Sequence, residues 1–223
     1  MAKKRKNSNY VTPKTQALAA EKARRAKNAK IRKIVIASVS ALLVVALIVV
    51  GIILIANRSF KATHHVNIEI ENYGTIHLEL YGKEAPKTVE NFVKLAEEGY
   101  YDGLTFHRII EGFMMQGGDG KDTASIYGEF KSNGFDNDVK HKRGAISMAR
   151  TNDPDSASSQ FFIVHTTEGA EHLDGDYAAF GMVTSGIEIV DQICTTVKPY
   201  DNNGSITQSQ QPIIKSITVH EVH

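Results

Sequence analysis

Hydrophobic residues follow two contrasting patterns along this chain. From Ile34 to Ala56 they form one run of 23 residues without a charge. As a helix this run would be about 35 Å long, enough to cross a bilayer. From Val66 onward hydrophobic residues come in short runs separated by Gly, Asn and Asp, a pattern typical of strands and turns. We therefore expect one transmembrane helix followed by one folded domain.

The periodicity of the second part predicts a mainly β domain with two helices. Residues 66–70 and 76–80 alternate around an Asn-Tyr-Gly turn and predict a β-hairpin. Pro86 suits the first turn of a helix that Gly99 would end, and a second helix is expected over 187–195. The other expected strands are 104–110, 113–116, 145–149, 161–165, 180–183 and 213–222, around a loop-rich middle from Asp119 to Arg143. Many short strands suggest a barrel or a sandwich.

Charge divides the chain at the apolar run. The 223 residues carry 26 Lys+Arg and 25 Asp+Glu, but residues 1–33 hold 12 Lys/Arg against a single acid, Glu21. Because positive residues flank membrane spans on the cytoplasmic side, we expect a basic cytoplasmic tail (1–33), a transmembrane helix (34–56), a linker (57–65) and an extracytoplasmic domain (66–223). A cleaved signal peptide is the alternative, but its apolar core is typically only about 7–15 residues.

The basic tail has two readings. It could bind anionic lipid or nucleic acid through its charge, but it has no interleaved aromatic residues beyond Tyr10 for base stacking. We favour a topology signal, with lipid contacted through the apolar run and no nucleic-acid partner.

Most familiar catalytic motifs are missing from the sequence. The single cysteine, Cys194, excludes an intramolecular disulfide and a multi-cysteine zinc site. The nine histidines lack ligand spacing, so we expect no metal, and no Gly-x-Ser-x-Gly elbow indicates a nucleophile. Arg108 is the unusual residue, a guanidinium within the apolar pattern FHRIIEGFMMQGGDG. It either serves a site or pairs with Glu111 or Asp119, and the residues alone do not decide between these.

Four segments between Val66 and Val222 carry a resemblance to a known family. They are APKTVENFVKLAEEGYYDGLTFHRII, GFMMQGGDG, RGAISMAR with SSQFFIV, and HLDGDYAAFGMV followed by GIEIVDQI. Together they resemble the cyclophilin family of peptidyl-prolyl cis/trans isomerases. The resemblance implies a closed eight-stranded antiparallel β-barrel capped by two α-helices, here preceded by the transmembrane helix. It implies no cofactor.

The resemblance also implies roles for individual residues. Arg108, Phe113 and Gln116 match the family's catalytic positions. The substrate-binding positions are matched by Met114, Ala149, Gln160, Phe162, His172, Leu173, Tyr177 and Phe180. His172 replaces a frequent Trp, and a polar ring in place of an indole argues against strong binding of cyclosporin. Tyr177 replaces a frequent His at the pocket rim. Arg150 replaces the Asn of many eukaryotic members, and SMAR is similar to bacterial members.

The implied activity is catalysis of rotation about X-Pro bonds. The barrier to this rotation is roughly 18–20 kcal/mol, so an enzyme must favour the twisted amide. We expect a monomeric folding catalyst acting on X-Pro segments of unfolded or flexible exported or surface proteins, held at a bacterial cell membrane. The alternative is a proline-peptide binding module or chaperone with little turnover.

Overall fold

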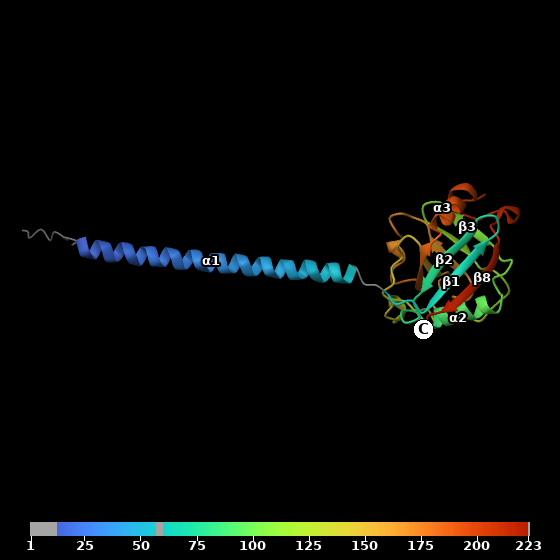
Figure 1. Ribbon diagram of the computed structural model, residues 1–223, viewed down its shortest axis with the longest axis horizontal. Coiled ribbons are helices and arrows are strands. Elements are labelled where there is room, and N and C mark those ends of the chain that lie inside the picture. The colour runs from blue at the N-terminus through green and yellow to red at the C-terminus, as the bar shows by residue number, and fades with distance from the viewer. Residues whose placement is uncertain (1–12, 57–59, 223) are drawn as a thin grey trace, which may run out of the picture. The chain divides into compact units, whose positions relative to one another are not determined.

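The computed structural model describes residues 13–56 and 60–222 (Figure 1). The chain divides into two compact units, Met1–Ser59 and Phe60–His223. Part of the expected tail, residues 1–12, and part of the expected linker, residues 57–59, lie outside the described residues.

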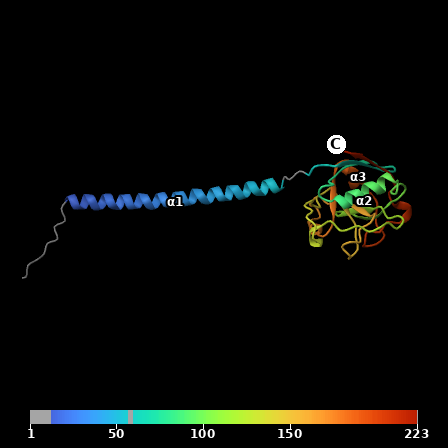
Figure 2. The same cartoon turned by 90° about the horizontal axis from the view of Figure 1, so that it is seen from below.

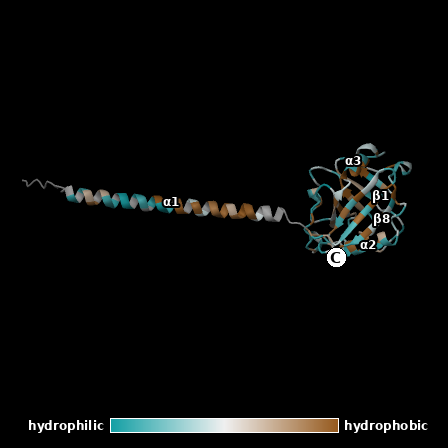
Figure 3. Ribbon diagram, in the orientation of Figure 1, coloured by the Kyte–Doolittle hydropathy of each residue, from teal (hydrophilic) through white to brown (hydrophobic). Residues whose placement is uncertain are grey.

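The described residues of the first unit form one long helix, α1 (Pro13–Ala56). Figure 3 shows that α1 is hydrophilic in its N-terminal half and hydrophobic in its C-terminal half. The segment Lys30–Gly51 has a mean hydropathy of 3.0 over its most apolar window and, by length and composition, is able to cross a membrane. The helix begins well before the apolar run, so much of the basic segment is helical too.

The second unit is built on eight antiparallel strands, as the sequence predicted. The strands are β1 (His64–Ile70), β2 (Gly74–Leu80), β3 (Phe106–Ile110), β4 (Met114–Gly117), β5 (Ala145–Met148), β6 (Phe161–Val164), β7 (Ala179–Ser185) and β8 (Ile214–Glu221). They form one sheet in the order β3-β4-β6-β5-β7-β2-β1-β8. Each lies within two residues of its expected position, and β1 begins inside the segment expected to be linker.

The sheet curls so that its two end strands approach each other. An isolated bridge joins Thr105 to Ile213, and the amides of Phe106 and Ile214 donate to the carbonyls of Pro212 (2.9 Å) and Leu104 (2.7 Å). The barrel is therefore closed by a few backbone hydrogen bonds at the first residues of β3 and β8, rather than by a continuous ladder.

Two helices cover the ends of this barrel, α2 (Pro86–Glu97) and α3 (Ile187–Thr196). They lie at opposite ends in Figure 1, and Figure 2 shows α2 across the end facing the viewer. Three short 3₁₀ helices, which the sequence did not predict, are η1 (Lys131–Asn133), η2 (Glu171–Leu173) and η3 (Gln208–Gln210).

The start of α2 lacks a capping side chain of its own, because its N-cap residue is Ala85. The carboxylate of Glu129 supplies the cap from the loop-rich middle, accepting the backbone N–H groups of Lys87 (2.9 Å) and Thr88 (2.8 Å). Helix N-termini leave such donors unpaired and favour negative charge. This long-range cap ties the middle loop to the barrel.

Strands β4, β5 and β6 lie between two apolar clusters, one packed against each face of the sheet. Inward residues such as Met115 and Phe161 join the main core, which also holds Phe92 and Phe180. Outward residues such as Met114 and Phe162 join a second cluster. Since successive side chains of a strand point to opposite faces, the same strands build the core and the floor of a surface pocket.

Candidate active site

A pocket of about 200 Å³ lies over the second apolar cluster. Its lining comes from segments far apart in the sequence, namely β3, β4, β6, η2 and the chain that follows β5. The lining residues are Arg108, Phe113, Met114, Gln116, Ala149, Arg150, Phe162, Leu173 and Tyr177.

The floor of this pocket is apolar and well supported. Met114, Phe162 and Leu173 are each at least nine-tenths buried. The ring of Phe162 meets Tyr177 edge-on at 6.1 Å, and Phe113 packs against His172 at 5.5 Å between ring centroids. Rings held by their neighbours give a preformed surface for a small apolar group.

Arg108 stands beside this floor and is held by uncharged groups. Its Nε donates to the carbonyl of Asn203 (2.7 Å), and its Nη1 donates to Oε1 of Gln116 (3.3 Å). Within residues 60–222 it forms no ion pair, because Glu111 is paired with Lys198 and Asp119 accepts a hydrogen bond from Gln160. The structural alternative, pairing with Glu111 or Asp119, is therefore wrong. The guanidinium charge is not neutralised by a carboxylate.

Two glutamine side chains continue the contact from Arg108. Nε2 of Gln116 donates to Oε1 of Gln160 (2.8 Å), and Nε2 of Gln160 donates to Oδ1 of Asp119 (3.0 Å). Because the carboxylate of Asp119 can only accept, it fixes the direction of both amides. The Gln116 oxygen is consequently turned toward Arg108. We call this chain of three bonds the amide relay.

A buried polar group lies behind the pocket wall. The ring of His141 is stacked 6.0 Å from Phe162 and contacts Oδ1 of Asp174 and Oγ of Ser147, both at 3.0 Å. Burial lowers the pKa of His141, and the hydrogen bond that its ring donates to Asp174 opposes this only in part. Partial burial alone would raise the pKa of Asp174, but its hydrogen bonds with His141 and Lys140 outweigh this and lower it.

Burial shifts the pKa of two further side chains, Cys194 and His107. Burial raises the pKa of the Cys194 thiol to about 12, which keeps it protonated and unreactive. Burial lowers the pKa of His107, whose Nδ1 is buried without a hydrogen-bond partner. In the described part of the chain, no group of three His, Cys, Asp or Glu side chains could hold a metal ion.

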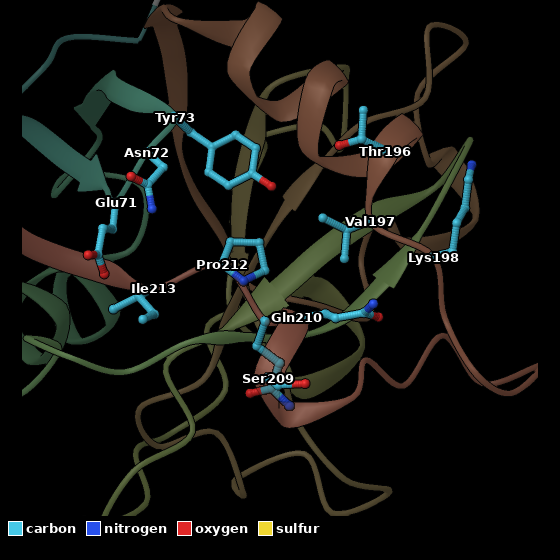
Figure 4. A pocket seen from close by; sticks show the side chains of 11 residues that line it. Glu71, Asn72, Tyr73, Thr196, Val197, Lys198, Ser209, Gln210, Pro212 and Ile213 are labelled. Atoms are coloured by element: carbon cyan, nitrogen blue, oxygen red, sulfur yellow. The ribbon is translucent and has the colours of Figure 1, made fainter.

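A larger hollow of about 540 Å³ lies elsewhere on the domain, lined by the turn 71–73, the end of α3 and residues 209–213. Figure 4 shows its two charged residues, Glu71 and Lys198, on opposite sides of the hollow. Lys198 is already paired with Glu111 at 3.1 Å. The smaller pocket is the better candidate site, because it alone of the two combines an unpaired cation with a buried apolar floor.

Comparison of the sequence with known proteins identifies the family. A family model described as cyclophilin type peptidyl-prolyl cis-trans isomerase/CLD matches residues 65–222. The chain belongs to the cyclophilin family. Peptidyl-prolyl cis-trans isomerase B of Bacillus subtilis is 49% identical over 121 residues, covering 53% of this chain and 82% of that protein. The peptidyl-prolyl cis-trans isomerase of Helicobacter pylori is 46% identical over 126 residues, covering 55% and 76%.

A solved structure agrees with this assignment. The cyclophilin type peptidyl-prolyl cis-trans isomerase of Cryptosporidium parvum, crystallised in the presence of the dipeptide Ala-Pro, has a TM-score of 0.60 and 31% identity. The match covers 71% of this chain and 99% of that one. The family and the fold expected from the sequence motifs are thus confirmed.

The structure brings all of the expected cyclophilin site residues together except Phe180. Gln160 and His172 do not line the pocket but contact lining residues, Gln116 and Phe113 respectively. Phe180 is not at the pocket. Its side chain is fully buried in the main core, 5.3 Å from the ring of Phe92. It follows Ala179 on β7 with its side chain on the inward face, which the motif could not show.

Sequence reasoning missed two residues that shape the site. Arg150 lines the pocket, and SMAR drew attention to it only as a family variant. His165 holds the turn that carries Phe113 through two hydrogen bonds. Its ring Nδ1 accepts from the backbone N–H of Gly112 (3.0 Å), and its backbone N–H donates to the carbonyl of Phe113 (2.8 Å). No sequence signal marked His165, because its role depends on contacts across the sheet.

Proposed function

We propose that residues 60–223 catalyse cis/trans isomerisation of X-Pro bonds in flexible polypeptide segments, with Arg108 as the principal catalytic residue. The observation that carries this proposal is the guanidinium of Arg108, held without a carboxylate partner beside a preformed apolar floor. A prolyl isomerase needs both parts, an apolar surface for the proline ring and a hydrogen-bond donor for the nitrogen of the twisted X-Pro amide.

The apolar floor would bind the pyrrolidine ring. Phe113, Met114, Phe162 and Leu173 would surround it, and Ala149 beside them would contact the flanking peptide. This binding fixes the proline while the rest of the chain remains able to rotate. The Ala-Pro dipeptide present with the Cryptosporidium parvum relative supports a site for X-Pro peptides in this family.

Arg108 would supply the preference for the transition state. As the X-Pro amide twists, its nitrogen loses conjugation and becomes a better acceptor, so a positioned donor stabilises the twisted form more than the planar one. Gln116 would keep the guanidinium in place through the bond to Nη1. No bond is made or broken and no cofactor is needed.

A binding module with little turnover would need the floor but not the cation. A protease-coupled isomerisation assay therefore separates the two functions. We expect residues 60–223 to be active and Arg108→Ala to lose about 100-fold or more in kcat/KM, as for removal of one transition-state donor. Circular dichroism must show that the variant is folded. A folded but inactive wild-type domain would refute the enzyme proposal.

We further propose that α1 anchors this isomerase in a bacterial cell membrane, with the basic segment in the cytoplasm and the isomerase domain outside. The apolar length of α1 and the Lys and Arg residues before it support this topology. The enzyme would then act on exported chains, whose proline isomerisation takes about 10–100 s without catalysis. Protease added to intact cells should remove the isomerase domain, and its protection would exclude this orientation.

A further inference from the structure

Arg150 is the second guanidinium of the pocket, and it lies against two aromatic rings. Its Cζ lies 4.5 Å from the ring centroid of Tyr177 and 5.1 Å from that of Phe130. Phe130 is buried and comes from the middle loop, while Tyr177 lines the pocket itself. An arginine stacked in this way has already lost most of its rotational freedom, so a ligand does not have to order it.

The hydrogen bonds of Arg150 leave part of its donor capacity unused. Its Nε donates to the carbonyl of Asp176 and its Nη1 to the carbonyl of Thr151, both at 2.8 Å. A guanidinium has five N–H donors. One on Nη1 and two on Nη2 thus have no partner among residues 60–222, which is enough for both oxygens of a carboxylate.

The charge of Arg150 is also unneutralised. No Asp or Glu of the described residues forms an ion pair with it, whereas Arg143, outside the pocket, is paired with Asp191 at 2.6 Å. Arg108 is unpaired too, so one small pocket carries two free guanidinium charges. The chain beyond residue 33 is acidic, with 24 Asp+Glu against 14 Lys+Arg, and both pocket arginines are included in that count. The pocket therefore carries local positive charge on a domain whose net charge is negative.

The position of Arg150 determines which part of a substrate it would meet. It directly follows Ala149, whose N–H is bonded to the Gln160 carbonyl at 2.9 Å, and both residues line the pocket beside the apolar floor. With the proline ring on that floor, Arg150 would lie beside the residues that flank the proline.

We propose that Arg150 makes this isomerase selective for X-Pro segments that carry a carboxylate side chain beside the proline. This inference rests on the proposed isomerase function and adds a substrate class to it. Ion pairs at half-exposed positions are weak individually, but a preorganised bidentate arginine increases their strength. We expect a preference of about fivefold for Glu over Gln in kcat/KM, close to 1 kcal/mol.

The test uses the full chain in detergent micelles and matched peptides that differ only in charge. One pair places Glu or Gln immediately before the proline, and a second pair places them immediately after it. Exchange NMR measures isomerisation, and chemical-shift titration measures peptide binding in the same samples. Arg150→Gln removes the charge, and Arg150→Lys retains it without the planar fork.

We expect a Glu preference in at least one pair of peptides, weakening as salt is raised. It should disappear in Arg150→Gln and persist in reduced form in Arg150→Lys. Equal Kd and equal rates for Glu and Gln peptides in the wild type, or a preference unchanged in Arg150→Gln, would overturn the inference. A charge preference in binding without any exchange would support Arg150 selectivity and refute only the isomerase function.

Discussion

Breaking the amide relay should impair catalysis without unfolding the domain. In Gln160→Leu, Gln116 loses its 2.8 Å acceptor and Asp119 loses its donor. The first bond is partly buried and is worth about 1 kcal/mol, and the second is exposed and contributes less than about 0.5 kcal/mol. If this energy holds Gln116 toward Arg108 in the transition state, its loss of about 1–1.5 kcal/mol lowers kcat/KM about 5- to 13-fold.

Asp119→Asn is the matched control for this prediction. Asparagine keeps an oxygen that accepts the Gln160 amide, so the relay stays connected, while the charge and the acceptor-only character of the carboxylate are removed. We expect kcat/KM to fall by less than about threefold, because the exposed hydrogen bond from Gln160 is weakened but not lost. The assay is protease-coupled isomerisation of one neutral X-Pro peptide, with thermal unfolding as the folding control. A Gln160→Leu variant with wild-type kcat/KM would show that the relay does not orient Arg108.

Three further predictions follow from other contacts. His165→Ala removes the hydrogen bond from the Gly112 N–H and so loosens the turn 111–113. The KM for an X-Pro peptide should rise about threefold, the effect of one lost hydrogen bond. An unchanged KM would exclude a role for His165 in placing Phe113. Phe180→Leu should lower the free energy of unfolding by about 1 kcal/mol and leave KM unchanged, whereas a raised KM would return Phe180 to the pocket. Because folding lowers the pKa of His107 and His141, the unfolded chain binds protons more readily. Urea unfolding should therefore show stability that is complete above about pH 6.5 and falls as pH is lowered below it, and greater stability at pH 5.5 than at pH 8 would contradict this.

The sequence predicted the eight strands because most of them carry a local signal. In β1 and β2 hydrophobic residues alternate, and the inward residues Val66, Ile68, Leu78 and Leu80 are almost fully buried. Helix α2 was predicted from Pro86 and from apolar spacing. Its cap was not, because Glu129 lies more than forty residues away. Local pattern determines the elements, whereas their long-range partners depend on the packed structure.

The same distinction applies to the site. Arg108, Phe113 and Gln116 were found because the family motif contains them in one short stretch. Arg150 lies in the pocket, against Phe130 and Tyr177, and these contacts join segments that are far apart in the sequence. Phe180 shows the converse error, since a motif position gives no information about which face of β7 a side chain occupies. The 3₁₀ helix η2, which places Leu173, is too short to leave a periodic signal.

The most direct test of the account compares catalysis with binding in Arg108→Lys. Lysine keeps the positive charge but loses the planar fork that bonds both Asn203 and Gln116. Exchange NMR of an X-Pro peptide gives the rate of isomerisation on the enzyme, and a titration gives its Kd. We predict that the bound rate falls by at least about tenfold while Kd changes less than about threefold, because the apolar floor is intact. An unchanged bound rate in the folded variant would contradict the central claim that Arg108 stabilises the twisted amide.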